Sequence, residues 1–390
     1  MKVLHIFDLY LPATLSWTHR LLLHLEPLQV SVAAPWIIKN QFFSPAFEYH
    51  IFPAQRWFFP KVLSETDHAT ARKIFAGSQR YLPVYIWWLY TRLNTHKPDL
   101  LHAHFGPVAC LYLPLAKRLK RPLLVTFYGF DYTKVLNLKP FYKEKYHELF
   151  RDAAQIIAGS PLGYDLLKKM GCPAEKLSII PPGIDLFNFP FRVRPKKSGA
   201  LKLVQMSTIT PKKGHLDTLE AFRQALYKCP NLQLCLAGEK WDKDLVKTME
   251  VFIRTHHLSG HITWLDVVDH ANAGAFLRQF DVLIHPSCHA PDGDHEDTPV
   301  VILEAQSTGL PVISTTHFNI PAEVIHDRTG LLAEEHNPAQ LAGFIERFYQ
   351  MDDAEYQEFS RAARRHVEEN FDVRNTAEAL RRVYEKVARG

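Results

Sequence analysis

Two glutamates stand eight positions apart in this chain, and the residues between them change from polar to apolar. Glu296 lies in a polar loop, residues 291–299, and Glu304 lies in an expected helix that begins near Pro299, because proline is tolerated at a first helical position. The start of a helix offers unpaired N–H groups and partial positive charge, which suit a phosphate group. Carboxylates beside it can accept hydrogen bonds from sugar hydroxyls. The pair therefore predicts a site for a ligand that combines phosphate and sugar.

A lysine further up the chain fits the same chemistry. Lys213 belongs to residues 211–215, which follow an expected strand over residues 201–205 and open a helix. An ammonium group beside a helix start can neutralise a diphosphate. Taken alone, each of these three residues is more often a solvated surface group. Their combination carries the prediction.

Polar and aromatic residues also gather at the ends of expected strands in the first half of the chain. Strands over residues 100–103 and 123–127 end where open α/β sheets place their ligands. The loop after the first strand carries a tryptophan, whose face can stack on a sugar ring. Packing in a core or at a strand end is an equally good interpretation of the two histidines and the tryptophan. The candidates here are Ser16, Trp17, His102, His104, Tyr128 and Asp131.

Strand and helix patterns alternate along the whole chain, which is typical of parallel sheets covered by helices on both faces. A first domain is expected over residues 1–186, and a segment rich in Pro, Phe and Arg, residues 187–199, follows it as a linker. A second domain is expected over residues 200–370, and residues 371–390 form a closing amphipathic helix. The predicted fold class is α/β, with two doubly wound, Rossmann-like domains and the cleft between them as the expected ligand site.

Composition limits the class of protein. Of 390 residues, 47% are hydrophobic and 22% are charged, which is ordinary for a globular protein whose core needs no metal or disulfide. Five scattered cysteines, an odd number, favour free thiols in a reducing cytoplasm. The first residues favour a strand rather than a secretion signal, and the longest apolar stretch, residues 81–90, is too short to span a bilayer. We therefore expect a cytoplasmic protein that does not cross a membrane.

Charge is distributed unevenly between the two halves. Residues 1–190 hold 22 Lys and Arg against 13 Asp and Glu, whereas residues 191–390 hold 24 against 28. The basic half indicates either an anionic partner or surface, or a chance excess of surface lysine. Aromatic and basic residues in 52–63 and 81–92, including Trp87 and Trp88, favour peripheral contact with the inner face of a membrane, or else a buried core. The positive charge is diffuse and forms no basic recognition helix, so we expect no nucleic-acid binding.

The segment from Glu296 to Glu304, followed by Ala305, residues 309–312 (Gly-Leu-Pro-Val) and residues 321–323 (Pro-Ala-Glu), resembles the Glu-x7-Glu region of retaining glycosyltransferases of family 4. The amino-acid pattern of residues 293–299 resembles that of the family branch that builds bacterial exopolysaccharides such as colanic acid. This likeness runs through nearly the whole chain. It implies a GT-B fold, with two Rossmann-like domains facing a cleft and a C-terminal helix that packs back on the first domain.

The resemblance also implies a role for each candidate. Glu296 contacts the transferred sugar and stabilises charge at its anomeric carbon, Glu304 accepts from ribose hydroxyls, and Lys213 holds the donor phosphates. Glu296 and Lys213 are then the catalytic residues. The implied donor-binding residues are Ser207, Thr208, Lys213, Thr298, Val300 and Glu304, and the implied acceptor-binding residues are Ser16, Trp17, His104, Tyr128 and Asp131.

Two positions depart from the family pattern. Thr208 stands where relatives carry a phosphate-binding arginine, and it offers one hydrogen-bond donor in place of five. Tyr128 stands where relatives carry a histidine, and a tyrosine cannot act as a general base near neutral pH. No protein base is required if the leaving diphosphate takes the proton of the acceptor, which is the mechanism that the resemblance implies.

Two residue patterns suggest metals. Asp292 and Asp294 spell an Asp-x-Asp motif, whose hard oxygen ligands suit Mg²⁺ or Mn²⁺, but that motif belongs to a different, single-domain glycosyltransferase fold. Zinc-type residues also gather in one stretch, but their spacing fits no standard ligand pattern. That stretch holds His285, Cys288, His289 and His295. We therefore expect no metal and no other cofactor.

The sequence thus predicts a glycosyltransferase that retains anomeric configuration and moves a sugar from a nucleotide-sugar donor, UDP-linked more readily than GDP-linked. The acceptor is a glycan or lipid-linked glycan in the synthesis of a cell-surface polysaccharide. Two alternatives remain open. A nucleotide-sugar epimerase on the same fold would convert its donor without any acceptor, and a binding protein without catalysis would bind a nucleotide sugar without releasing the nucleoside diphosphate.

Overall fold

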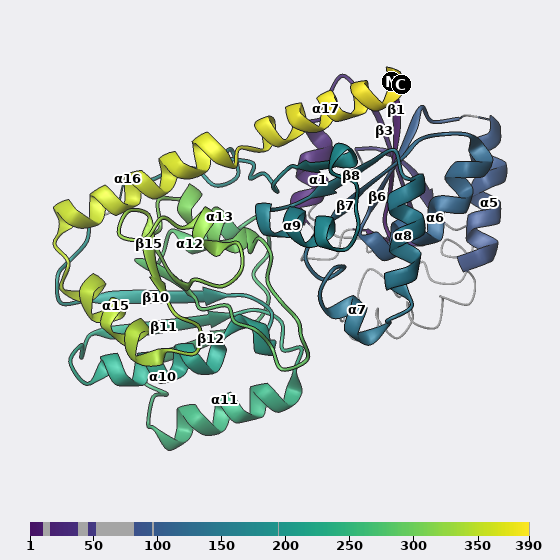
Figure 1. Ribbon diagram of the computed structural model, residues 1–390. Coiled ribbons are helices and arrows are strands. Elements are labelled where there is room, and N and C mark those ends of the chain that lie inside the picture. The colour runs from purple at the N-terminus through teal and green to yellow at the C-terminus, as the bar shows by residue number, and fades with distance from the viewer. Residues whose placement is uncertain (11–15, 38–45, 52–81, 96, 194, 390) are drawn as a thin grey trace. The chain divides into compact units, whose positions relative to one another are not determined.

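The computed structural model describes residues 1–390 except 11–15, 38–45, 52–81, 96, 194 and 390. The chain forms two compact units, Met1–Pro181 with Arg374–Gly390, and Pro182–Val373 (Figure 1). The segment proposed as a linker, residues 187–199, belongs to the second unit. There the Lys196 N–H donates to Asp353 Oδ1 at 2.7 Å, and Arg364 Nη1 donates to the Phe189 carbonyl at 2.9 Å. The basic aromatic segment 52–63 lies outside the described residues.

The first unit contains a seven-stranded sheet in which every pairing is parallel. In spatial order its strands are β5 (Glu48–Ile51), β3 (Gln29–Ala34), β1 (Lys2–Ile6), β6 (Leu100–His104), β7 (Leu123–Phe127), β8 (Gln155–Ala158) and β9 (Leu177–Ile179). Two short strands, β2 (Leu9–Tyr10) and β4 (Trp36–Ile37), pair separately. The strand order reverses between β1 and β6, which is the switch point of a doubly wound fold.

Helices flank this sheet, and their ends follow local sequence signals. Helix α9 begins after Ser160, whose Oγ accepts the N–H of Gly163 at 2.9 Å, with Pro161 at the first helical position. The helices of this unit are α1 (Ser16–Leu23), α5 (Leu82–Thr95), α6 (Gly106–Leu119), α7 (Lys134–Leu138), α8 (Tyr142–Asp152), α9 (Pro161–Lys169) and most of α17 (Val373–Arg389).

The last helix, α17, is held to the rest of the first unit by polar contacts. The Tyr384 hydroxyl lies 2.6 Å from His102 Nδ1, and Arg381 donates to the carbonyls of His24 and Glu26 at 2.9 Å each. The chain therefore returns to its first unit after completing the second (Figure 1).

The second unit contains a six-stranded parallel sheet. In spatial order its strands are β12 (Ile262–Leu265), β11 (Leu232–Ala237), β10 (Leu201–Met206), β13 (Val282–His285), β14 (Val312–Thr315) and β15 (Gly330–Ala333). This order, in which the third strand comes first and the first strand is central, is that of a dinucleotide-binding Rossmann sheet. Its switch point lies between β10 and β13.

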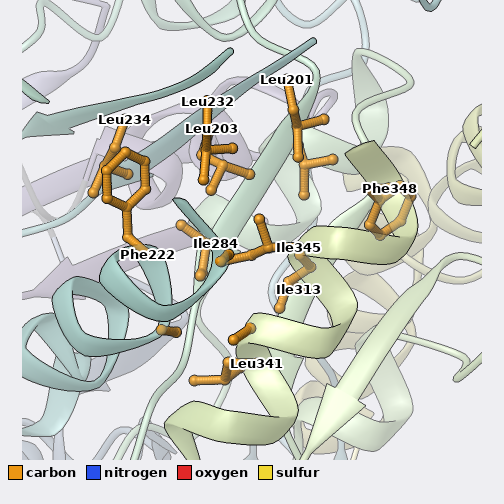
Figure 2. Close-up of a cluster of buried hydrophobic side chains, with 14 of the residues drawn as sticks. Leu201, Leu203, Phe222, Leu232, Leu234, Ile284, Ile313, Leu341, Ile345 and Phe348 are labelled. Carbon is orange, nitrogen blue, oxygen red and sulfur yellow. The ribbon is translucent and has the colours of Figure 1, made fainter. Parts of the chain in front are cut away.

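Apolar residues alternate between the two faces of the second sheet and so build two cores. Leu203 and Ile284 pack with Phe222 and Ile345 on one face (Figure 2), and Val204 and Leu283 pack with helix residues on the other. The helices of this unit are α10 (His215–Leu226), α11 (Lys243–Thr255), α12 (Ala273–Leu277), α13 (Val300–Ser307), α14 (Ile320–Glu323), α15 (Pro338–Gln350) and α16 (Asp353–Asn370). Helices α10 and α15 cover the face shown in Figure 2.

Several details differ from the sequence expectation. Pro299 caps α13 instead of beginning it. Trp17 is buried within α1, and Trp87 is 65% exposed, so the buried-core interpretation holds for the first and fails for the second. Trp88 is partly buried and stacks on Tyr85 with 5.8 Å between ring centroids. The cysteines, in contrast, agree with the sequence expectation, because all five are free.

Among the helices that can be described, none combines the length and the apolar character needed to cross a bilayer.

Candidate active site

The second unit brings Lys213 and Glu296 into contact. Lys213 ends the short helix η4 (Pro211–Lys213) after β10, and Glu296 lies in the loop that follows β13. These two strands flank the switch point of the sheet, where open α/β sheets bind their ligands. Lys213 Nζ and Glu296 Oε2 form an ion pair, and the two side chains are only 13% and 14% exposed. Two residues that the sequence assigned to one site are therefore neighbours.

A glycine permits this approach of the two loops. Gly214 follows Lys213 with φ of 65°, and a Cβ atom there would lie 1.9 Å from the carbonyl oxygen of Pro286. Any side chain would therefore push the two loops apart. The backbone N–H of Cys288 donates to the Lys212 carbonyl at 3.0 Å and joins the same two loops. The geometry around Lys213 is thus fixed by backbone as well as by charge.

Electrostatics keep the Glu296 carboxylate ionised. Burial raises the pKa of Glu296, but the ammonium groups of Lys213 and Lys212 outweigh burial and lower that pKa to about 2. Burial lowers the pKa of Lys213 below its usual value, and Glu296 opposes this shift. The pair is a buried cation held by a buried anion, which a phosphate group could replace as the partner of the lysine.

A second lysine forms a parallel contact. Lys212 Nζ lies 3.1 Å from Asp294 Oδ1 and donates to the His295 carbonyl at 3.2 Å. Asp294 also donates its backbone N–H to Asp292 Oδ1 at 3.1 Å. One carboxylate of the Asp-x-Asp pattern is therefore engaged by a lysine, and the other shapes the loop.

Buried polar atoms without a hydrogen-bond partner gather at this end of the sheet. Burial lowers the pKa of His285 well below its usual value, with Lys213 acting in the same direction. The pKa of Glu323 is raised well above its usual value, mainly by burial and then by Asp297 and Glu296. Such groups cost free energy unless a ligand or water completes them. The atoms are Gln205 Oε1, Thr210 Oγ1, His215 Nδ1, both ring nitrogens of His285, Ser287 Oγ, His295 Nδ1 and both carboxyl oxygens of Glu323.

Glu304 lies in α13, where it is buried. Its Oε1 atom is 3.0 Å from Nε2 of His270, a residue that no sequence pattern indicated. His270 comes from the segment between β12 and α12, so its proximity depends on the fold alone.

The remaining donor-side candidates occupy the same loops. Ser207 Oγ lies 3.4 Å from His215 Nε2, and the Ser207 carbonyl faces Gly238, where a Cβ atom would approach to 1.9 Å. Thr298 Oγ1 accepts from Asn319 Nδ2 at 3.4 Å. Thr208 is partly buried after β10, and Val300 is the first residue of α13.

A histidine at the end of β14 holds the backbone of Glu296. His317 Nε2 accepts the Glu296 N–H at 3.2 Å, so the ring proton lies on Nδ1, which donates to Glu335 Oε1 at 2.7 Å. Burial lowers the pKa of His317, and Glu335 opposes that shift. Burial raises the pKa of Glu335, but hydrogen bonds from the His289 backbone and from the His317 and His289 rings lower it to about 2. Sequence reasoning missed both His317 and Glu335.

The four zinc-type residues singled out in the sequence do not form one group. His289 lies with His317 and Glu335, whereas Cys288 lies with Asp217 and His336. His285 is buried near Lys213.

In the first unit, His104, Tyr128 and Trp17 lie together at the carboxyl end of the sheet. His104 Nδ1 is 2.6 Å from the Tyr128 hydroxyl, and the Trp17 ring meets the Tyr128 ring edge-on at 5.2 Å. Burial raises the pKa of Tyr128 and lowers the pKa of His104. Ser16, the first residue of α1, is buried.

The buried side chain of Asp131 binds two backbone N–H groups in this unit. Its two carboxyl oxygens accept the N–H groups of Tyr128 at 2.9 Å and Gly106 at 3.0 Å. It therefore joins the loop after β7 to the start of α6.

Two further histidines lie in this region, and the sequence had not indicated that they would contact His104 or Tyr384. His5 Nδ1 lies 3.0 Å from His104 Nε2, and His102 lies 2.7 Å from the Thr126 hydroxyl as well as beside Tyr384. Burial lowers the pKa of His102 to about 3 and that of His5 well below its usual value, so these rings are neutral. The period of two along β6 could have indicated that His102 and His104 share one face.

The model of glycosyl transferases group 1 matches residues 188–366, and the model of glycosyltransferase family 4 matches residues 45–187. The chain therefore belongs to glycosyltransferase family 4, and its two units form a GT-B glycosyltransferase fold. The expected resemblance to family 4 and the expected GT-B fold class are confirmed.

Individual relatives agree with this assignment. The chain is 30% identical over 281 residues to a putative colanic acid biosynthesis glycosyltransferase of Escherichia coli (strain K12), covering 71% of this chain and 68% of that protein. It is 28% identical to an amylovoran biosynthesis glycosyltransferase of Erwinia amylovora, covering 74% and 70%. A crystal structure of Anabaena HepE in complex with UDP and glucose has a similar fold, with a TM-score of 0.72, 16% identity and coverage of 99% and 100%.

Proposed function

We propose that this protein is a retaining glycosyltransferase that moves a sugar from a nucleotide-sugar donor, UDP-linked by preference, to a glycan or lipid-linked glycan in exopolysaccharide synthesis. The observation that carries the proposal is the buried Lys213–Glu296 ion pair at the switch point of the second sheet, surrounded by polar atoms without partners. The colanic acid and amylovoran relatives support the choice of pathway, and the UDP complex of the Anabaena structure supports the choice of nucleotide.

The donor side assigns one task to each charged residue. Lys213 binds the diphosphate of the donor and stabilises the charge that grows on it as it departs. Glu304, buried at its place in α13, accepts hydrogen bonds from the ribose hydroxyls. Glu296 accepts from the transferred sugar, and its charge stabilises the cationic character of the anomeric carbon.

The chemical step needs no protein base. The bond between the anomeric carbon and the diphosphate oxygen breaks while the acceptor oxygen bonds to the same face of that carbon. The acceptor proton passes to the departing phosphate oxygen, so atoms and charge balance. The raised pKa of Tyr128 and the lowered pKa of His104 support this route, because the first hardly ionises and the second binds protons weakly. We propose that the step uses no metal ion.

A lipid-linked acceptor would bring the enzyme to the inner face of a membrane. Helix α5 supports this part of the proposal, because it exposes Val84 and Trp87 and carries Arg92 near its end. Aromatic and basic side chains together favour the membrane interface.

A thermal-shift screen with UDP-, GDP-, ADP- and dTDP-sugars tests the donor, and proton NMR of the product tests the anomeric configuration. We expect a shift with a UDP-sugar, and release of UDP only when an acceptor is added. Conversion of the donor without acceptor would instead identify an epimerase. Binding without release of nucleoside diphosphate, whatever the acceptor, would identify a binding protein.

A further inference from the structure

Two histidines and one glutamate from three neighbouring strand ends meet in the second unit. His289 follows β13, His317 follows β14 and Glu335 follows β15. The three strands are hydrogen-bonded neighbours, so the sheet itself fixes the spacing of the three side chains. Figure 1 locates this edge of the sheet by its β15 label. None of these residues belongs to the proposed donor contacts.

The atoms that face one another are those that bind transition metals. His289 Nδ1 lies 2.8 Å from both Glu335 oxygens, and His317 Nδ1 lies 2.7 Å from one of them. One ligand atom from each residue falls within 4.8 Å of the other two. Zinc bonds of about 2.0–2.2 Å separate ligand atoms by roughly 3.3 Å, so each of these nitrogen–oxygen distances needs to lengthen by only about half an ångström to admit an ion.

The donor set selects the kind of ion. Two imidazole nitrogens and one carboxylate are the set found in zinc sites that keep a fourth position open, whereas Mg²⁺ and Ca²⁺ prefer oxygen ligands. His289 is 56% exposed and provides an entry from solvent. His295 adds a third imidazole nearby, with 4.2 Å between its ring centroid and that of His289, and its buried Nδ1 has no hydrogen-bond partner.

We propose that His289, His317 and Glu335 bind Zn²⁺, and that the bound ion inhibits the proposed transfer by releasing the backbone of Glu296. The inhibition rests on the proposed function, whereas the metal site does not. Free His317 carries its single ring proton on Nδ1, and its Nε2 accepts the Glu296 N–H. Zinc on Nδ1 takes the place of that proton, which moves to Nε2 without any net release.

Two hydrogen-bond donors then face each other. The new Nε2–H of His317 meets the N–H of Glu296, so the loop that carries Glu296 loses its anchor. Loss of a buried hydrogen bond costs about 1–3 kcal/mol, a factor of about 5–150 in an equilibrium. The coupling between two bound ligands is reciprocal. A nucleotide-sugar donor whose binding needs Glu296 in place therefore lowers the affinity for zinc by the same factor.

Three measurements on the full chain test the proposal. Titration with ZnCl₂ against a chromophoric chelator should show one ion per chain, with MgCl₂ and CaCl₂ inactive. His289→Ala should weaken zinc binding at least tenfold, while His256→Ala, at an exposed histidine elsewhere in this unit, should leave it unchanged. Hydrogen exchange should speed up in the peptide that contains Glu296 when zinc is added to the wild type, and not in His289→Ala.

In the transfer assay, zinc should slow the wild type at least fivefold, reversibly with EDTA, and should not slow His289→Ala. Retained zinc binding in His289→Ala, or exchange at Glu296 that zinc does not change, would overturn the inference. If no donor and acceptor support transfer, the proposed function fails, but zinc binding and hydrogen exchange still decide the metal site.

Discussion

Replacing Glu296 by glutamine should tighten the binding of UDP while it abolishes most of the transfer. In the proposed site Lys213 must hold a diphosphate that carries the same sign of charge as Glu296. The two side chains are 13% and 14% exposed, so an effective dielectric constant of about 20 applies. A phosphate and the Glu296 carboxylate on opposite sides of one ammonium group lie about 5 Å apart, and their repulsion is about 3 kcal/mol at most.

Salt and solvent screen most of that repulsion and leave only a part of it. We expect about 1 kcal/mol to survive at physiological ionic strength, which corresponds to UDP binding about fivefold tighter in Glu296→Gln. Turnover should fall at least a hundredfold, because the glutamine cannot stabilise positive charge at the anomeric carbon. Lys213→Gln provides the opposite control, because it removes the cation and should weaken UDP binding by about tenfold or more.

Calorimetry with UDP measures both effects at two salt concentrations, and urea unfolding checks the fold. Breaking a buried ion pair costs about 3–5 kcal/mol of stability, so both single variants should be less stable. The double variant Lys213→Gln/Glu296→Gln should lose less than the sum of the two. UDP binding that is unchanged or weaker in a folded Glu296→Gln variant would show that this carboxylate does not face the diphosphate.

Four further outcomes are expected. Glu304→Gln should weaken UDP binding by about 10–100-fold in calorimetry, because charged acceptors contribute about 1.5–3 kcal/mol to a hydrogen bond; unchanged affinity would remove it from the ribose site. Thr208→Arg should tighten UDP binding, since it restores a bidentate phosphate ligand, and no gain would place the diphosphate elsewhere. Activity should survive EDTA, and a loss restored by Mn²⁺ would contradict a metal-free step. Burial lowers the pKa of His5, His102 and His104, so below the unfolded pKa of about 6.5 the unfolded chain binds more protons. Stability is then lost as pH falls, by up to about 1.4 kcal/mol for each ring between pH 7.5 and 5.5 in urea unfolding, and equal stability at both pH values would contradict neutral buried rings.

The elements themselves could be predicted to within a residue or two. Parallel strands that are buried on both faces consist of short runs of apolar residues. The expected strand over residues 201–205 is an example, and the structure has a strand over Leu201–Met206 there. The contact between Lys213 and Glu296 could be expected because both follow strands that flank a switch point. A resemblance to a family supplied the pairing of these two loops, which spacing alone does not determine.

Contacts between elements that are distant in the sequence could not be predicted in the same way. The hydrogen bond between His102 and Tyr384 joins residues 282 positions apart, and it exists because α17 returns to the first unit. His317 and Glu335 meet because β14 and β15 are neighbours in the sheet. Each such contact depends on how the strands and helices are ordered in space, and no periodicity in the sequence encodes which of them lie side by side.

The charges around η4 suggest how the proposed site works without the arginine that Thr208 replaces. Lys212 and Lys213 carry two positive charges, and Asp294 and Glu296 neutralise them. A donor diphosphate brings about two negative charges, so the loops can accept it only if one lysine exchanges its carboxylate for phosphate. Lys212 is the available second cation, because it stands next to Lys213 in η4 and its Nζ lies 3.1 Å from Asp294 Oδ1. In the proposed function Lys212 therefore supplies from the neighbouring position the charge that an arginine supplies in relatives.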